Sequence, residues 1–430
     1  MAVMSWLASA NDPDSDFPIQ NLPYGVFRYR GCTQIGVAIG DRILDLCACA
    51  CCGLFDGLAE EIQSACKAEI LNELMGLGAA AWAALRERMT ALLGAESADA
   101  ETRSRVEKGL APMRDAVMQM PARIGDYTDF YASIDHAMRV GRLFRPDNPL
   151  LPNYKYLPIG YHGRASSIVI GGSEIRRPCG QVKEPDAAPV FAPSKSLDYE
   201  LEVGILMGSG NRLGEAISID DAERRVFGLC LVNDWSARDM QAWEYQPLGP
   251  FLAKSFATTI SPWVVPLAAL APYRVPLRKR AEGDPEPLGH LRSADTERDG
   301  IDLTLKVYLE SRKMRETGVP PERVSSGNLR DLYWSIAQLV AHHASNGCNL
   351  RTGDLLATGT VSGSEEGSEG CLLEMRHRSR PLCLPTGELR SFLEDGDRVI
   401  LRAFAQGSGL SRIGFGECAG VVVEAGTLQL

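Results

Sequence analysis

The sequence lacks the features of membrane and nucleic-acid-binding proteins. No apolar run approaches the ~18 residues of a membrane-spanning helix, and the apolar start Met1–Ala10 has no basic flank, so it is a poor signal peptide. Basic residues are in the minority, with 45 Lys and Arg against 55 Asp and Glu, which gives a net charge of −10. An acidic chain without a basic stripe argues against nucleic-acid binding. We therefore expect no membrane and no nucleic-acid partner.

Several catalytic and metal-binding signatures are also missing. The chain has no H-E-x-x-H, G-x-S-x-G or P-loop motif, so zinc protease, serine hydrolase and P-loop NTPase are unsupported. Cys49 and Cys52 are in C-x-x-C spacing, but no second pair follows at zinc-finger distance. Twelve cysteines without a secretory signal predict reduced, mostly buried thiols in a cytoplasmic protein.

The hydrophobic patterning predicts a mainly β (α+β) fold with two domains, 1–118 and 119–430. Alternating residues at 35–46 predict a hairpin, and helical spacing follows in 55–94. After residue 120 most segments alternate like strands, and two helices are predicted, at 220–227 and 332–345. The charged segment Arg278–Arg298 has no periodicity and is predicted to be an exposed loop.

The segment Leu197–Leu206 carries the strongest chemical signal. Strand geometry places Glu200 and Glu202 on one face, with backbones roughly 6.5–7 Å apart. Two readings remain open, namely a solvated strand face and two ligands of a hard divalent cation. Asp234 follows an apolar run and Asp129 lies among aromatic residues. Carboxylates in such settings need a partner, and a metal is one, although a turn or N-cap role is the alternative for each.

Two further groups are candidates for catalysis. If the segment after Asp234 is helical, Arg238, Gln241 and Tyr245 share one face, which suits a carboxylate or a developing oxyanion. The alternative is a solvent-facing helix with an ion pair. His136 follows Asp129 by seven residues and is a candidate general base, since the ordinary pKa of histidine is near neutral.

Taken together, these segments resemble the fumarylacetoacetate hydrolase family. The matching stretches are FPIQNLPYGVF (17–27), IGVAIGDRILDL (35–46), DYTDFYASIDHA (126–137), LPIGYHGRASS (157–167), LDYELEVG (197–204), NDWSARDMQAWEYQPLGPFLAKSF (233–256), HHASNGCNLRTGDLLATGT (342–360) and RIGFGECAG (412–420). They run nearly end to end, and 233–256 is the most specific. Shorter relatives share the E-x-E…D triad but usually lack the N-terminal matches.

The resemblance implies a fold and an activity. The expected fold is a small N-terminal SH3-like barrel followed by a large mixed β-roll that forms a homodimer. The expected reaction is metal-dependent cleavage of the carbon–carbon bond of 4-fumarylacetoacetate into fumarate and acetoacetate, the last step of tyrosine and phenylalanine breakdown. An acylpyruvate or related β-diketone hydrolase is the alternative, and a non-catalytic, calcium-stabilised protein is a third possibility.

Roles for individual residues are likewise carried over from matching motif positions. His136 matches the general base, Glu374 the carboxylate that orients it, and Arg238, Gln241 and Lys254 the groups that stabilise negative charge. The expected Ca²⁺ ligands are Asp129, Glu200, Glu202 and Asp234, and the expected Mg²⁺ site comprises Asp234, Lys254 and Thr258. The expected substrate contacts are Tyr131, Arg145, Tyr161, Gln241, Tyr245 and Thr360. Ala257 departs from the pattern, which has glycine there, and the sequence leaves open whether its methyl group shifts the loop that carries Thr258.

Overall fold

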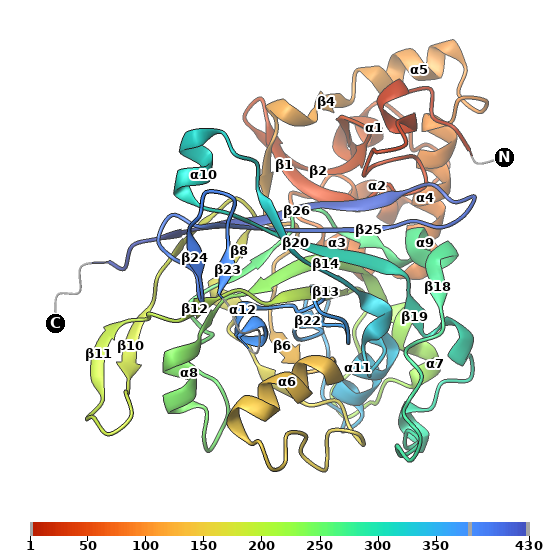
Figure 1. Cartoon of the computed structure of the whole chain (residues 1–430). Helices are drawn as coiled ribbons and strands as arrows, with labels where there is room; N and C mark the ends of the chain where they lie inside the picture. The colour runs from red at the N-terminus through yellow and green to blue at the C-terminus, as the bar shows by residue number, and fades with distance from the viewer. Residues whose placement is uncertain (1–2, 377–380, 427–430) are drawn as a thin grey trace.

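The computed structural model describes residues 3–376 and 381–426 and shows a strand-rich fold of mixed α and β structure (Figure 1). This confirms the coarse fold class. The N-terminal part is an antiparallel sheet in the order β4-β3-β2-β1-β5, accompanied by helices. Its elements are β1 (Tyr24–Tyr29), β2 (Cys32–Ile39), β3 (Arg42–Asp45), α1 (Leu46–Cys51), α2 (Glu60–Ala65), α3 (Asn72–Gly76), α4 (Ala79–Leu93), α5 (Ala100–Glu107), β4 (Leu110–Pro112) and β5 (Val117–Gln119). The predicted hairpin at 35–46 is present as β2 and β3.

Two larger sheets make up the rest of the molecule. The first runs β7-β6-β22-β13-β14-β16-β8, with β17 also paired to β14. Its strands are β6 (Tyr127–Phe130), β7 (Gly160–His162), β8 (Ile168–Ile170), β13 (Leu201–Met207), β14 (Val226–Asp234), β16 (Thr258–Ile260), β17 (Val265–Pro266) and β22 (Leu355–Ala357). The second runs β21-β20-β25-β26-β9. Its strands are β9 (Glu174–Arg176), β20 (Leu303–Glu310), β21 (Glu322–Asn328), β25 (Arg398–Ala405) and β26 (Ile413–Val423). Buried side chains of both sheets form one core.

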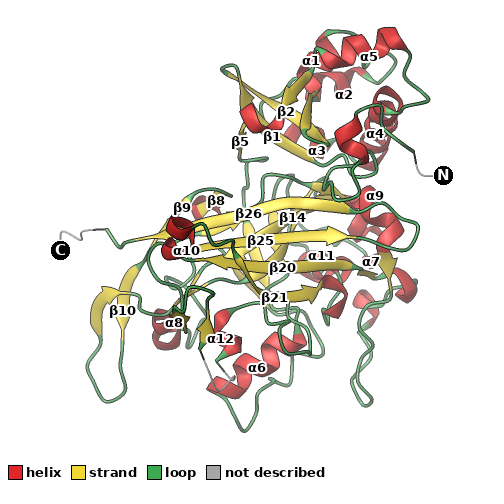
Figure 2. Ribbon diagram, turned by 45° about the horizontal axis from the view of Figure 1, so that its top comes forward, coloured by secondary structure: helices red, strands yellow, loops and turns green. Residues whose placement is uncertain are grey.

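Short strand pairs and helices complete this part, and Figure 2 shows α6, α8 and α12 together on one side of the sheets. The strand pairs are β10 (Cys179–Val182) with β11 (Val190–Pro193), β12 (Leu197–Asp198) with β15 (Ser236–Ala237), β18 (Arg274–Val275) with β19 (Gly300–Ile301), and β23 (Leu382–Cys383) with β24 (Leu389–Arg390). The helices are α6 (Ile134–Phe144), α7 (Ile219–Ala222), α8 (Arg238–Glu244), α9 (Leu267–Leu270), α10 (Arg312–Thr317), α11 (Ile336–Ala344) and α12 (Leu372–Met375). Nowhere in 3–376 or 381–426 is a helix both long and apolar enough to cross a membrane.

The expectation of only two helices after residue 120 is wrong. The helix predicted at 332–345 is confirmed as α11, but the one at 220–227 shortens to α7 and a 3-10 turn. The pattern missed α6 and α10, which have 11 and 6 residues. Their starts are nevertheless encoded, since Ser133 and Ser311 each accept a hydrogen bond from a backbone N–H three residues on.

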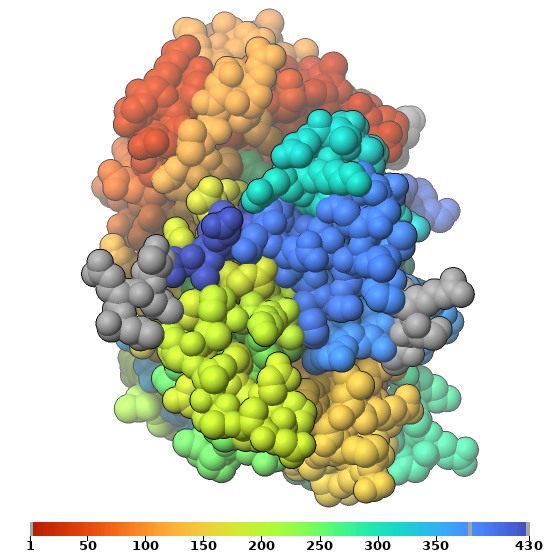
Figure 3. All heavy atoms as spheres, turned by 60° about the vertical axis from the view of Figure 1, so that its left-hand side comes forward, coloured from red at the N-terminus to blue at the C-terminus, as the bar shows by residue number. Residues whose placement is uncertain are grey.

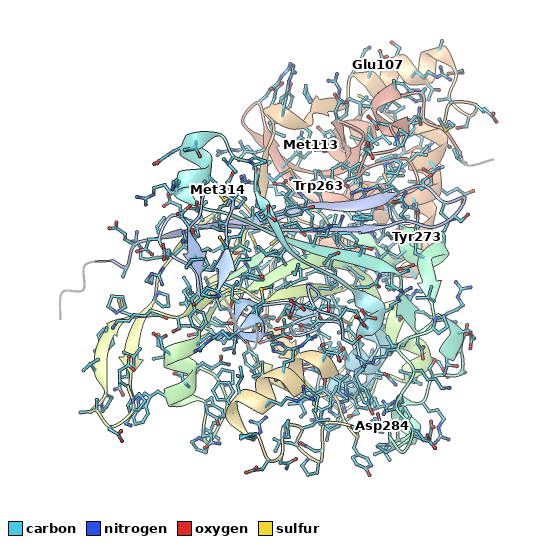
Figure 4. All side chains as sticks on the ribbon, in the orientation of Figure 1. Glu107, Met113, Trp263, Tyr273, Asp284 and Met314 are labelled. Carbon is cyan, nitrogen blue, oxygen red and sulfur yellow. The ribbon has the colours of Figure 1, made fainter. Side chains whose placement is uncertain are left out.

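The N-terminal part packs directly on the first large sheet. The rings of Trp82 and Tyr24 lie 5.3 and 5.2 Å from the ring of Phe227 on β14, between centroids. The ring centroid of Trp263, a residue labelled in Figure 4, lies 5.5 Å from the ring centroid of Phe17. The N-terminal part therefore supports the opposite end of strands that carry the candidate site.

Candidate active site and metal centre

The order of strands in the first large sheet brings the predicted acidic residues to one place. Asp129 is on β6, whose parallel partner β22 pairs it with Ala357. Glu202 is on β13, next to β22, and Asp234 ends β14, the other neighbour of β13. Glu200 stands just before β13, and its carbonyl oxygen accepts a hydrogen bond from the backbone N–H of Asp234. Four carboxylates that are far apart in sequence therefore converge.

The carboxylates of Asp129, Glu200, Glu202 and Asp234 form a buried cluster. Each offers an oxygen, and these four oxygens lie within 4.8 Å of one another. The solvated-face reading of Glu200 and Glu202 is therefore wrong. The sequence of this segment alternates between apolar and acidic residues, as in a strand with one exposed face. In the structure both faces of β13 are buried.

Two cations balance part of this charge. The Lys254 ammonium lies 2.6 Å from Glu200 Oε2 and 2.6 Å from Asp234 Oδ2. Arg238 Nη1 lies 2.7 Å from Glu200 Oε1. Burial acts to raise the pKa of Glu200, but Lys254 and Arg238 outweigh it, so its pKa is lowered. Burial acts to lower the pKa of Lys254, but the carboxylates of Asp234 and Glu200 outweigh burial, so its pKa is raised.

The other side of the cluster is less well compensated, although Asp129 Oδ1 accepts a hydrogen bond from the backbone N–H of Gly359 at 3.1 Å. Both oxygens of Glu202 are buried and accept no hydrogen bond within the part of the chain that the structure describes. Burial, followed by repulsion from Asp129 and Asp234, raises the pKa of Glu202 well above its ordinary value. The pKa of Asp129 is raised for the same kinds of reason. A buried carboxylate without a donor, such as that of Glu202, fits a hard divalent cation, which prefers several oxygen ligands.

A histidine–carboxylate pair lies beside the cluster. His136 Nδ1 is 2.7 Å from Glu374 Oε1, and both side chains are buried. Arg139 Nη1 and Ser362 Oγ also donate to the Glu374 carboxylate, at 3.1 and 2.7 Å. Burial acts to raise the pKa of Glu374, but His136, Ser362 and Arg139 lower it to about 2. An ionised Glu374 fixes the tautomer of His136 with its proton on Nδ1, which leaves Nε2 as an acceptor.

The predicted cation–amide face is also formed. Arg238 and Gln241 lie on α8, and Arg238 Nη1 donates to Gln241 Oε1 at 3.0 Å. Because the amide oxygen of Gln241 is occupied, its NH₂ group is left to donate elsewhere. Arg238 Nη2 and Thr360 Oγ1 are buried without a partner among residues 3–376 and 381–426.

The remaining predicted substrate contacts lie around these groups. The Tyr131 ring meets His136 edge-on at 5.2 Å between centroids, and the Tyr161 hydroxyl donates to Asp234 Oδ2 at 2.8 Å. Tyr245 follows α8 and lies 5.8 Å from Phe144, the neighbour of Arg145. Arg145 itself caps the end of α6, and its Nη2 donates to Pro149 O at 3.4 Å.

Ala257 stands next to Thr258 in the loop of the expected Mg²⁺ site. Its methyl group is buried in the main core, and Thr258 Oγ1 donates to Asp234 Oδ1 at 3.1 Å. The side chain of Thr258 therefore reaches Asp234 with alanine at position 257.

Sequence reasoning missed Asp198, whose carboxylate is fully buried. Its Oδ1 accepts from the backbone N–H of Leu372 at 2.8 Å, and Oδ2 accepts from Leu373 N and Arg238 Nε, both at 3.0 Å. Asp198 thus joins the start of α12, which carries Glu374, to Arg238. Asp198 is in phase with Glu200 in the alternation of 197–206, but it lies on the short strand β12 and its carboxylate is not one of the four in the cluster.

Comparison with known proteins places this geometry in a family. Family models described as "Fumarylacetoacetate (FAA) hydrolase C-terminal" and "Fumarylacetoacetase N-terminal" match residues 127–423 and 20–121. The chain belongs to the fumarylacetoacetate hydrolase family. It is 49% identical to the fumarylacetoacetase of Caenorhabditis elegans over 422 residues, which cover 96% of this chain and 97% of that protein. It is 48% identical to the human fumarylacetoacetase over 429 residues, covering 98% and 99%.

A solved structure shares the fold of this fumarylacetoacetate hydrolase family member. A fumarylacetoacetate hydrolase from the psychrophilic Exiguobacterium antarcticum superposes with a TM-score of 0.52 at 16% identity, covering 94% of this chain and all of that one. Membership of the family establishes that the chain is an enzyme of hydrolase type, and the buried acidic cluster fits metal dependence.

Proposed function

We propose that this protein hydrolyses 4-fumarylacetoacetate to fumarate and acetoacetate. One observation carries the proposal. The buried carboxylate cluster lies beside an oriented His136–Glu374 pair and an Arg238 whose Nη2 has no protein partner within the described ranges. Hydrolysis of a β-diketone needs this combination, namely a base for water and positive charge for the oxyanion and for the departing carbanion. The nearly full-length similarity to curated fumarylacetoacetases supports this substrate.

The cation is proposed to be Ca²⁺, held by Asp129, Glu200, Glu202 and Asp234. When bound, such an ion polarises the substrate's diketone oxygens as a Lewis acid. A second ion, Mg²⁺, is proposed near Asp234, Lys254 and Thr258. The Lys254 ammonium has no lone pair, so an ion there would take oxygens from Asp234, Thr258 and backbone carbonyl groups.

The side chains account for the proton transfers. His136 Nε2 removes a proton from water as the water attacks a substrate carbonyl, and Glu374 holds the resulting imidazolium in place. Such general base catalysis contributes roughly 10²–10⁴-fold. Arg238 Nη2, the Gln241 amide and the Lys254 ammonium donate to the oxyanion. As the carbon–carbon bond breaks, the protonated His136 returns its proton to the methylene carbon of the departing acetoacetate enolate.

The distal carboxylate of the substrate needs a cation and hydroxyl groups. Arg145 and Tyr245 approach from the ends of α6 and α8, and Tyr131, Tyr161, Gln241 and Thr360 complete the proposed contacts. Thr360 Oγ1 supports this assignment, since it is buried without a partner among the described residues.

The test is an assay of the purified protein. Fumarylacetoacetate is mixed with enzyme and CaCl₂, loss of the diketone absorbance is followed, and the assay is repeated with chelator and with an acylpyruvate. We expect cleavage of fumarylacetoacetate that chelator abolishes and Ca²⁺ restores. Faster turnover of the acylpyruvate would transfer the protein to the alternative substrate class, and no turnover of either would refute a hydrolase role for this site.

The assembly is proposed to be a homodimer that uses an exposed apolar surface beside the site. The hairpin β10–β11 projects from the body (Figure 1), and in Figure 3 its yellow-green surface lies beside that of the segment containing α6. Val190 and Phe191 on the hairpin are exposed, and so are Leu248 (96%) and Phe251 (69%) in the loop after α8. Large exposed apolar patches are typical of interaction sites. Sedimentation analysis tests this assignment, and a monomer at micromolar concentration would contradict it.

Three further features are part of the proposal. The small antiparallel sheet β4-β3-β2-β1-β5 is taken as the SH3-like barrel, and the remaining sheets as the β-roll. The domains are taken as 1–118 and 119–430. A cytoplasmic location is supported by the twelve cysteines, all of which are free thiols.

A further inference from the structure

A second group of metal-ligating side chains lies behind the proposed base. His136, Cys371 and Glu374 each offer one ligand atom, these atoms lie within 4.8 Å of one another, and all three side chains are buried. Cys371 Sγ is 3.5 Å from Glu374 Oε1, and His136 Nδ1 is 2.7 Å from the same oxygen. The proposed reaction uses His136 and Glu374 but assigns no task to the thiol of Cys371.

The donor set differs in kind from that of the acidic cluster. One nitrogen, one sulfur and one oxygen are typical ligands of Zn²⁺, whereas Ca²⁺ takes oxygen alone. With bonds of ~2.0 Å to nitrogen and oxygen and ~2.3 Å to sulfur, a tetrahedral site has edges of about 3.5 Å between sulfur and oxygen and about 3.3 Å between nitrogen and oxygen. Cys371 Sγ and Glu374 Oε1 are already 3.5 Å apart, whereas His136 Nδ1 and Glu374 Oε1 must separate from 2.7 Å.

The surroundings are polar and mixed in charge. Arg139 donates to the other oxygen of Glu374, while the Asp198 carboxylate is close enough to act on the thiol. Burial, followed by Asp198 and Glu374, raises the pKa of Cys371 well above its ordinary value. Without a metal the thiol is therefore protonated and a poor nucleophile.

We propose that His136, Cys371 and Glu374 form an inhibitory site for a thiophilic divalent cation such as Zn²⁺. On binding, the Cys371 S–H bond breaks, its proton passes to solvent, and a metal–sulfur bond forms. The proton on His136 Nδ1 moves to Nε2 as Nδ1 becomes a ligand. Glu374 Oε1 exchanges its hydrogen bond from His136 for the metal, and water completes the four ligands. One proton is released for each ion bound.

Inhibition follows from the tautomer of His136, and this step rests on the proposed function. In the metal-free pair Nε2 carries the lone pair that accepts a proton from water. With the ion on Nδ1, Nε2 carries a hydrogen and has no lone pair to offer. The substrate and the Ca²⁺ cluster still bind, so the ion lowers kcat rather than substrate affinity.

The experiment uses the full chain saturated with CaCl₂, so that the acidic cluster stays occupied. Co²⁺ is titrated as a spectroscopic probe for thiolate coordination, and ZnCl₂ is then titrated in the activity assay. We expect a cobalt–thiolate charge-transfer band at one ion per chain, displacement of that band by Zn²⁺, and loss of activity that excess Ca²⁺ does not reverse. Inhibition that Ca²⁺ relieves competitively would overturn the proposal, and this result needs no variant.

Two variants separate this site from other thiols. Cys371→Ser is expected to lack the band and to raise the Zn²⁺ concentration for half-inhibition by more than about tenfold, since even loss of an outer-shell partner costs 10–100-fold in metal affinity. Cys418→Ser removes another fully buried thiol and is expected to behave like the parent. Equal Zn²⁺ sensitivity in Cys371→Ser would overturn the site. A cobalt–thiolate band without inhibition of fumarylacetoacetate cleavage would uphold metal binding and refute the inhibitory role. If the chain does not cleave fumarylacetoacetate, the band alone still tests metal binding.

Discussion

At the scale of single residues, Glu202 shows how the cluster depends on a cation. Its carboxylate is fully buried, and within 3–376 and 381–426 neither oxygen receives a hydrogen bond. Glu200, two residues earlier, lies between Lys254 and Arg238. The carboxylate of Glu200 is therefore compensated by two protein cations. The carboxylate of Glu202 has no hydrogen-bond donor within the described residues, so its charge needs an added cation.

Replacing Glu202 by Gln is expected to weaken Ca²⁺ binding by at least about tenfold, because it removes one charged ligand from the cluster. The same change is expected to raise the Tm of the metal-free protein, since it relieves repulsion from Asp129 and Asp234. Calorimetric Ca²⁺ titration and thermal unfolding measure both effects. Glu322→Gln, at an exposed strand end, is the control and should change neither. Unaltered Ca²⁺ affinity in Glu202→Gln would remove Glu202 from the ligand set.

His136 gives the second prediction at this scale. His136→Ala is expected to lower kcat by roughly 10²–10⁴-fold because water loses its base. Ca²⁺ affinity is expected to persist, since His136 is not one of the four clustered carboxylates. Turnover and metal content are measured on the same sample, and wild-type turnover in this variant would eliminate the base assignment.

The sequence predicted the individual site residues better than the contacts between them. Alternation in 197–206 identified Glu200 and Glu202, and the resemblance supplied His136 and Glu374. Neither showed that Lys254 bridges Glu200 and Asp234, because that contact depends on how strands remote in sequence are ordered in the sheet. Arg139 was within reach of sequence reasoning, since it lies three residues after His136 on the same helix face.

At the scale of elements, the short helix α12 is held in place from outside. Its four residues make too few internal bonds to fix it. The Asp198 carboxylate accepts the N–H groups of Leu372 and Leu373 and so acts as a remote N-cap. Periodicity could not reveal α12, because the information that stabilises it lies 174 residues earlier in the chain.

Asp198→Asn is expected to lower kcat by about 10–100-fold, the range typical for partners that orient functional groups. The side-chain amide accepts fewer hydrogen bonds than the carboxylate, so α12 and Arg238 are both held less firmly in position. Ca²⁺ affinity is expected to stay within a few fold, which distinguishes positioning from general unfolding. A kcat/KM analysis with a parallel Ca²⁺ titration measures the split. Equal losses of kcat and Ca²⁺ binding would instead indicate a structural role.

The segment 278–298 also differs in part from its prediction as an exposed loop. Most of it is exposed, but Arg280 stacks on Tyr333 and Trp334 at 4.2 and 4.6 Å from their ring centres. Asp284, labelled in Figure 4, pairs with Lys155. A loop without periodicity can thus be anchored by single side chains, which a search for repeating patterns does not detect.

At the scale of the whole molecule, the family fold was predictable and the arrangement of its parts was not. Motifs spread over nearly the entire chain implied the family. The packing of Trp82 and Tyr24 on Phe227 joins the N-terminal part to β14, the strand that ends in Asp234. Stability of the whole fold and occupation of the metal centre are therefore physically linked.

That linkage predicts how metal removal acts at different pH. In the chelated protein the raised pKa values of Asp129 and Glu202 mean that the folded state binds more protons than the unfolded state above about pH 4. Stability of the chelated protein therefore falls as pH rises from the unfolded pKa towards the folded one, and the loss is complete above it. Ca²⁺ replaces those protons. The difference in Tm between Ca²⁺-loaded and chelated protein is therefore expected to widen between about pH 5 and 8. Differential scanning fluorimetry across this range measures the difference in Tm.

The variant Glu202→Gln should flatten this trend with pH. A difference in Tm that is independent of pH in the parent protein would show that protons and Ca²⁺ do not compete for these carboxylates.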